Sequence, residues 1–84
     1  MRVVFTATAL EDIARLPRAA QKRIVTKLEY FCMQDNPLAA GKPLTGYHGF
    51  YRFRIGAYRV VVQPSGGTMF VHAVDRRDKA SQDL

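Results

Sequence analysis

The stretch Gly49-Phe-Tyr-Arg-Phe-Arg-Ile-Gly56-Ala-Tyr-Arg-Val-Val-Val-Gln63 determines the expected architecture of this chain of 84 residues. From Phe50 to Ile55, apolar and basic side chains alternate, which is typical of a β-strand with one buried face. Gly56-Ala57 predicts a two-residue type II′ turn, because that turn takes glycine first. Residues 58–63 are then the returning strand of a hairpin.

The segments on both sides of this hairpin extend the expected sheet or lead into it. Pro64-Ser-Gly-Gly67 predicts a second turn, and Thr68 to Val74 predicts a third strand of the meander. Upstream, residues 37–49 predict a loop, because they contain Pro37, Gly41, Pro43, Gly46 and Gly49. Residues 75–84 form a polar tail.

The first part of the chain predicts a short strand followed by two helices. Residues 2–6 are rich in β-branched and aromatic types and predict the strand. Thr8-Ala-Leu-Glu11 matches a capping box, so the first helix is expected to begin there and to end at Pro17. The second helix is expected over about residues 18–34. The apolar positions at helical spacing are Leu10, Ile13 and Ala14 in the first helix, and Ala20, Ile24, Leu28 and Phe31 in the second.

The sequence therefore predicts an α+β fold of order β-α-α-β-β-β, with an antiparallel sheet and a helical hairpin on one face. This length allows one domain, residues 1–84. Hydrophobic residues make up 48% and charged residues 24%, which is ordinary globular composition and excludes disorder. We find neither a membrane span nor a signal-peptide pattern. Cys32 is the single cysteine, so no internal disulfide can form, and a cytoplasmic location is expected.

The charge of the chain is strongly positive and unevenly distributed. Lysine and arginine number 13 against 7 acidic residues, giving a net charge of +6. No acid occurs between Asn36 and Val74, where Lys42, Arg52, Arg54 and Arg59 lie. This pattern favours a polyanionic partner, either nucleic acid or an acidic protein. The alternative is a charge that only keeps the domain dispersed.

Arg52 and Arg54 are expected on one face of their strand, with Arg59 on the neighbouring strand and Arg77 after the last one. Such a surface binds phosphates, because the planar guanidinium group makes several hydrogen bonds to them. It is equally compatible with a solvated sheet face. The aromatic residues near this segment either stack on RNA bases or anchor the core; they are Tyr47, Phe50, Tyr51 and Tyr58.

His48 and His72 are the candidates for acid–base chemistry near neutral pH, although a single histidine is more often structural. These two histidines and Cys32 do not form a recognised set of metal ligands, so no metal is expected. We interpret Cys32 as a packing residue. No glycine-rich phosphate loop joins a strand to a helix, so no nucleotide cofactor is expected either.

Four segments carry a resemblance to a known family: Lys42-Pro-Leu-Thr-Gly46, Gly49-Phe-Tyr-Arg-Phe-Arg-Ile-Gly56, Tyr58-Arg-Val-Val61 and Val74-Asp-Arg-Arg77. In this order they resemble the RelE/ParE superfamily of type II toxin–antitoxin toxins, closest to the RelE branch. The predicted order of strands and helices agrees with that fold over nearly the whole chain.

The resemblance implies a metal-independent endoribonuclease that cuts mRNA in the ribosomal A site. The 2′-hydroxyl attacks the neighbouring phosphate, leaving a cyclic phosphate and a free 5′-hydroxyl. It also implies a cognate antitoxin that neutralises the toxin, and a hetero-oligomer of the two on operator DNA. By the same resemblance Arg52, Arg54, Arg59 and Arg77 are catalytic. Lys42, Tyr51 and Arg76, which lie in the same segments, are the candidates for RNA binding.

Two departures from the RelE pattern bear on activity. Arg52 stands where that pattern has a lysine, and arginine does not act as a base under ordinary conditions. No tyrosine follows Tyr58, although the family often has one near the C-terminus. The acid–base group is therefore missing or replaced, and the candidates to replace it are His48, His72, Asp78 and Asp83.

Three functions remain open at this point. The first is ribosome-dependent mRNA cleavage. The second is inhibition of DNA gyrase by a ParE-like toxin that binds without cutting RNA, although the short chain argues against the longer helices of that branch. The third is an inactive member that only binds its antitoxin. Under all three, the antitoxin is expected to place an acidic or amphipathic segment on the basic surface.

Overall fold

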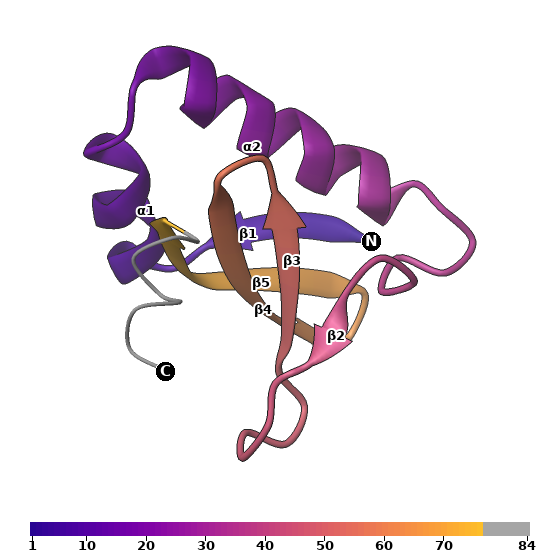
Figure 1. The fold of residues 1–84 in the computed structure, drawn as a ribbon. Helices are drawn as coiled ribbons and strands as arrows, with labels where there is room; N and C mark the ends of the chain where they lie inside the picture. The colour runs from indigo at the N-terminus through magenta and orange to yellow at the C-terminus, as the bar shows by residue number, and fades with distance from the viewer. Residues whose placement is uncertain (77–84) are drawn as a thin grey trace.

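Residues 1–76 are described by a computed structural model as one five-stranded sheet with two helices. The elements are β1(Arg2–Phe5), α1(Ala7–Ala14), α2(Arg18–Cys32), β2(Lys42–Pro43), β3(Tyr51–Ile55), β4(Tyr58–Ser65) and β5(Thr68–Arg76). The strands lie in the order β1-β5-β4-β3-β2, and both helices lie on one face of the sheet (Figure 1). The predicted α+β fold is therefore confirmed. Neither helix among these residues is long and apolar enough to cross a membrane.

The first helix begins two residues earlier than predicted. Thr6 is its N-cap, and the Thr6 Oγ1 accepts a hydrogen bond from the Ala9 amide at 3.2 Å. The capping box at Thr8 was therefore wrong. The reason is tertiary: the Thr6 amide donates to the Val71 carbonyl at 3.0 Å, so the chain leaves the sheet at this residue. Leu10 and Ala14, predicted with Ile13 to face the core, are exposed, Leu10 to 56%, and Ala9 is the buried residue of this helix.

The core lies between the helices and one face of the sheet. Phe53 and Ile55 on β3 are buried as the alternation predicts, and Ile24 and Leu28 on α2 pack against the same cluster. Cys32 extends this helical stripe by one turn, and burial raises the pKa of its thiol. The other buried members are Ala9, Val60, Val62, Met69, Val71 and Val74. The opposite face, called the outer face below, carries the alternate residues of the strands.

The sheet differs from the prediction in two pairings. β1 pairs with β5 in parallel, with Phe5 opposite Val71, so the sheet is mixed and not purely antiparallel. Lys42 and Pro43, predicted to lie in a loop, form the short edge strand β2 beside β3. Both pairings join segments that are distant or irregular in sequence, where the local pattern carries little information.

A β-bulge interrupts the pairing of the two longest strands. Val61 lies opposite Ala73, but the next residue, Val62, lies opposite Val71, so His72 is the extra residue of β5. Three residues past the last pairing of β5 with β1, at Val71, the Val74 amide donates to the Asp12 Oδ2 of α1 at 2.9 Å. Beyond the bulge, β5 continues to Arg76, past the predicted end at Val74.

Candidate nucleic-acid interface

Four basic residues from three adjacent strands meet on the outer face. Arg52 and Arg54 project from β3 on the side away from Phe53 and Ile55, because successive side chains of a strand alternate. Lys42 of β2 lies opposite Arg52, and Arg59 of β4 lies opposite Arg54. Directly paired residues have Cβ atoms about 5 Å apart. The two pairs lie two residues apart along β3, so the pairing brings the four cations together in one patch.

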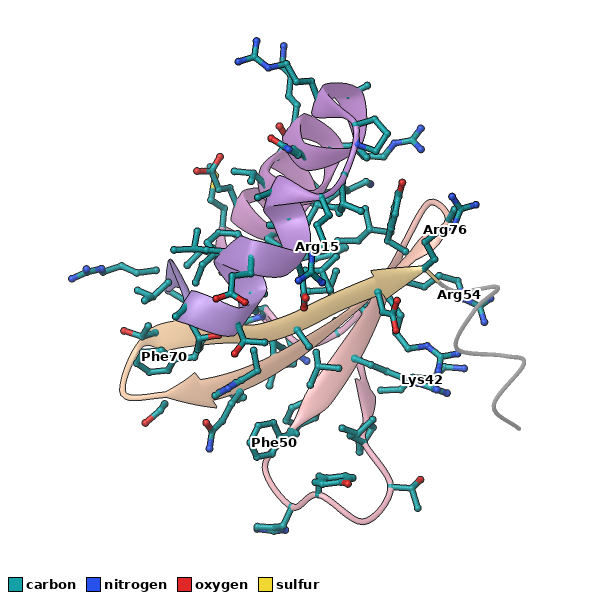
Figure 2. The ribbon with its side chains drawn as sticks, turned by 90° about the vertical axis from the view of Figure 1, so that its left-hand side faces the viewer. Arg15, Lys42, Phe50, Arg54, Phe70 and Arg76 are labelled. Carbon is teal, nitrogen blue, oxygen red and sulfur yellow. The ribbon has the colours of Figure 1, made fainter. Side chains whose placement is uncertain are left out.

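These four residues line a hollow of about 140 Å³, together with Ala40 and Phe53. We call it the cationic hollow and use that name for Lys42, Arg52, Arg54 and Arg59. Arg52 and Arg59 are half-buried, and Lys42 and Arg54 are exposed. Figure 2 shows Lys42 and Arg54 extending on the side of the sheet away from the helices.

No carboxylate in residues 1–76 forms an ion pair with the cationic hollow. Asp75 lies opposite Arg59 in the ladder, yet its Oδ1 accepts a hydrogen bond from the Arg76 amide at 2.8 Å. Like charges directly opposite each other destabilise a sheet. Two such pairs side by side therefore indicate a surface built to receive an anion, and guanidinium groups suit phosphate oxygens best.

Tyr51 and Arg76, also predicted to bind RNA, are not among the residues that line this hollow. Tyr51 lies on the core side of β3 and packs against the buried cluster, on the opposite face from Arg52 and Arg54. Arg76 ends β5, opposite Tyr58. Arg77, Asp78 and Asp83 lie outside the described residues, so their proposed roles stay predictions.

Neither histidine lines the cationic hollow. His48 lies in the loop between β2 and β3, where it lines a second hollow with residues 43–51 of that loop and its flanks. His72 is on the outer face, and its Nε2 donates to the Gln63 Oε1 at 3.0 Å, because an amide oxygen only accepts. Within the described chain, Lys42 is the one lining residue able to give up a proton. Residues 1–76 also contain no cluster of side chains that would hold a metal ion.

Sequence reasoning named all four members of the cationic hollow, and it named Phe50 and His72, but it did not predict that these two rings meet on the outer face. The Phe50 and His72 rings lie 5.1 Å apart between centroids, and Gln63 orients His72. No local pattern indicates these contacts, because the bulge at His72 decides which face that ring occupies.

Comparison with known proteins agrees with the family predicted from the motifs. The family model described as the ParE toxin of the type II toxin–antitoxin system parDE matches residues 3–80. A curated relative, toxin RelE3 of Methanocaldococcus jannaschii, is 33% identical over 81 residues, which cover 92% of this chain and 91% of the relative. The chain therefore belongs to the ParE toxin family, within the RelE/ParE superfamily of type II toxins, and is RelE-like.

Solved structures of RelE toxins share this fold. The RelB–RelE antitoxin–toxin complex from Methanococcus jannaschii matches with a TM-score of 0.74 and 25% identity, covering 96% of this chain and 98% of that one. The RelBE2 toxin–antitoxin complex from Mycobacterium tuberculosis matches with a TM-score of 0.73 and 30% identity, covering 90% of each chain.

Proposed function

We propose that this toxin cleaves mRNA bound to the ribosome, with the cationic hollow as the site of the scissile phosphate. The observation that supports this proposal is the convergence of four cations without a carboxylate partner within residues 1–76. A phosphate that undergoes internal attack gains negative charge on its equatorial oxygens. Hydrogen-bond donors that are already positioned toward such developing charge make the largest contribution to the rate enhancement in many enzymes.

The reaction needs no bound metal if side chains supply charge and protons. The 2′-oxygen forms a bond to the adjacent phosphorus and loses its proton to solvent, while the bond from phosphorus to the 5′-oxygen breaks. Arg54 and Arg59 hold the phosphate oxygens, and Arg52 orients the neighbouring backbone. The Lys42 ammonium gives its proton to the departing 5′-oxygen. Lys42, directly opposite Arg52, thus takes the proton-transfer role that Arg52 cannot perform.

We further infer that a cognate antitoxin binds this toxin, as the RelB–RelE and RelBE2 structures are complexes of a toxin with its antitoxin. An antitoxin segment that carries carboxylates over the cationic hollow would compete directly with RNA phosphates. The same surface then explains both activity and neutralisation.

A cell-free translation reaction with one defined mRNA tests the proposed cleavage. We expect cuts inside the reading frame, mapped by primer extension, that disappear when ribosomes are omitted. Arg54→Ala and Arg59→Ala should each lower the cleavage rate by about 10²-fold or more, as losing one preorganised donor does elsewhere. Lys22→Ala removes one exposed charge from α2 and serves as the matched control. Intact mRNA with the wild-type toxin would contradict the proposal.

Inhibition of DNA gyrase is the second candidate, favoured by the matched family model, whose description is a ParE toxin. The described lining of the cationic hollow also contains no imidazole or carboxylate, and inhibition by binding needs neither. A supercoiling assay with purified gyrase separates the two functions. Loss of supercoiling with intact mRNA would favour gyrase inhibition.

A further inference from the structure

The outer face has a second, aromatic part next to the cationic hollow. Phe50 precedes Arg52 by two residues and therefore lies on the same side of the chain, about 7 Å along the strand direction. Figure 2 shows Phe50 beside the start of β3, on the side of the sheet away from the helices. We call Tyr47, Phe50 and His72 the aromatic cluster.

The aromatic cluster is held together by ring contacts and one hydrogen bond. The Tyr47 and Phe50 rings meet edge to face with centroids 6.5 Å apart. The Phe50 ring in turn lies 5.1 Å from the His72 ring, which the bulge places on the outer face. Gln63 fixes His72 through the bond of 3.0 Å to its Nε2. Each ring is thus supported by the next, from the sheet outward to Tyr47.

The loop that carries Tyr47 is preorganised by its backbone. The Leu44 amide donates to the Phe50 carbonyl at 2.8 Å, and the Phe50 amide donates to the Tyr47 carbonyl at 3.1 Å. Gly46 and Gly49 flank Tyr47 and His48, and both have φ of 84°, which other residues rarely adopt. The loop therefore presents Tyr47 in a defined position despite its distance from the core.

Tyr47 is the outermost ring and is 63% exposed. A ring that only filled space beneath the loop would be covered, whereas this one has an accessible surface supported from behind by Phe50. Aromatic rings beside a cationic groove are how proteins bind single-stranded nucleic acid: the cations bind phosphates, and the rings stack on bases.

We propose that the aromatic cluster is a nucleobase-stacking site, with Tyr47 contacting a base next to the phosphate held in the cationic hollow. The class of ligand rests on the proposed function, but the site itself depends on RNA binding and not on cleavage. No tyrosine follows Tyr58 in the sequence, and the loop before β3 then supplies an exposed aromatic ring for the RNA.

Base stacking is measured directly with a short single-stranded RNA that carries 2-aminopurine and 2′-O-methyl groups, which prevent cleavage. Stacking on tyrosine quenches 2-aminopurine fluorescence. We expect quenching at saturation with the wild-type toxin and with Tyr47→Phe, which keeps the ring. Tyr47→Ala should lose most of this quenching and bind at least about fivefold more weakly.

Two controls separate stacking from charge and from general effects of substitution. Tyr30→Ala removes a comparably exposed tyrosine, 54% exposed, from the helical side of the molecule and should behave like the wild type. Arg54→Ala should weaken binding without changing the quenching at saturation, because it removes a phosphate contact and leaves the rings in place.

The inference is overturned if the wild-type toxin causes no quenching, or if Tyr47→Ala quenches as strongly at saturation as Tyr30→Ala. Its failure is distinguishable from failure of the proposed function. Quenching that depends on Tyr47, together with intact mRNA in the translation reaction, would keep the stacking site and reject cleavage. Cleavage of the mRNA, together with quenching that does not depend on Tyr47, would keep the proposed cleavage and reject the stacking site.

Discussion

At the scale of single residues, Asp12 shows how one side chain completes the sheet. The Val74 amide of β5 lies past the last residue paired with β1, and Asp12 Oδ2 accepts its hydrogen bond from α1. Asp12→Ala should therefore lower the free energy of unfolding by about 1–3 kcal/mol, because it leaves a buried donor unsatisfied. Urea denaturation followed by circular dichroism measures the change.

Two further variants make this expectation specific. Asp12→Asn keeps an oxygen acceptor and should restore much of the lost stability. Glu11→Ala, at the exposed neighbouring position, should change the free energy of unfolding by no more than about 0.5 kcal/mol. Equal losses for Glu11→Ala and Asp12→Ala would mean that the bond to Val74 does not stabilise the fold.

At the scale of elements, α2 holds the sheet through a narrow stripe of buried side chains. Leu28 is fully buried between α2 and the sheet, as the helical spacing predicts. Leu28→Ala should lower the free energy of unfolding by about 2–5 kcal/mol, because it removes buried methyl groups and leaves a cavity. Glu29→Ala, on the exposed side of the same helix, is the control for helix propensity in the same denaturation experiment. A loss of under about 1 kcal/mol for Leu28→Ala would contradict the packing described.

The elements also show which parts of the fold were predictable. The alternation of apolar and basic side chains in β3 and the helical spacing of apolar residues in α2 were sufficient to predict which side chains of these elements enter the core. In each element one local period decides which side chains are buried. The start of α1 was not predictable in this way. Thr6 and Thr8 are both acceptable caps, and the choice depends on the hydrogen bond from Thr6 to Val71, a residue far along the chain. The parallel pairing of β1 with β5 was not predictable for the same reason, because it also depends on contacts between distant parts of the chain.

The candidate site likewise has one part that local patterns predict and another part that depends on long-range contacts. Arg52, Arg54 and Arg59 follow from strand alternation and the hairpin turn, whereas Lys42 was a candidate for RNA binding whose place beside Arg52 in the edge strand β2 was not predicted. Tyr51 was assigned to RNA binding, but strand alternation places it on the core side. Tyr47 and Phe50 were named as residues that stack on bases or anchor the core, but their grouping with His72 was not predicted, because it combines a loop with a bulge and neither has a period that indicates where a ring lies.

At the scale of the whole molecule, the two faces of the sheet have different roles. One face packs against α1 and α2 and forms the core. The outer face carries the cationic hollow and the aromatic cluster on the same strands (Figure 2). Because the residues of the two faces alternate along β3, substitutions at Arg54 should change binding, whereas substitutions at Phe53 should change stability.

This separation predicts how RNA affinity responds to salt. Each phosphate neutralised on a single strand contributes about −0.7 to the slope of the logarithm of the binding constant against the logarithm of salt concentration. In the proposed arrangement Arg54 and Arg59 hold one phosphate and Arg52 the neighbouring one, so two neutralised phosphates should give a slope of about −1.4 for the wild-type toxin and a short single-stranded RNA. Fluorescence anisotropy titrations over a range of salt concentrations measure it.

The variants in this series should separate the two parts of the outer face. Arg52→Ala should reduce the slope in magnitude by about 0.7, because one phosphate fewer is neutralised and one counterion fewer is released. Tyr47→Ala should weaken binding at every salt concentration and leave the slope unchanged, because stacking releases no counterions. If Lys22→Ala on α2 reduced the slope as much as Arg52→Ala, the RNA would be contacting the whole basic surface, and the cationic hollow would have no special role as its binding site.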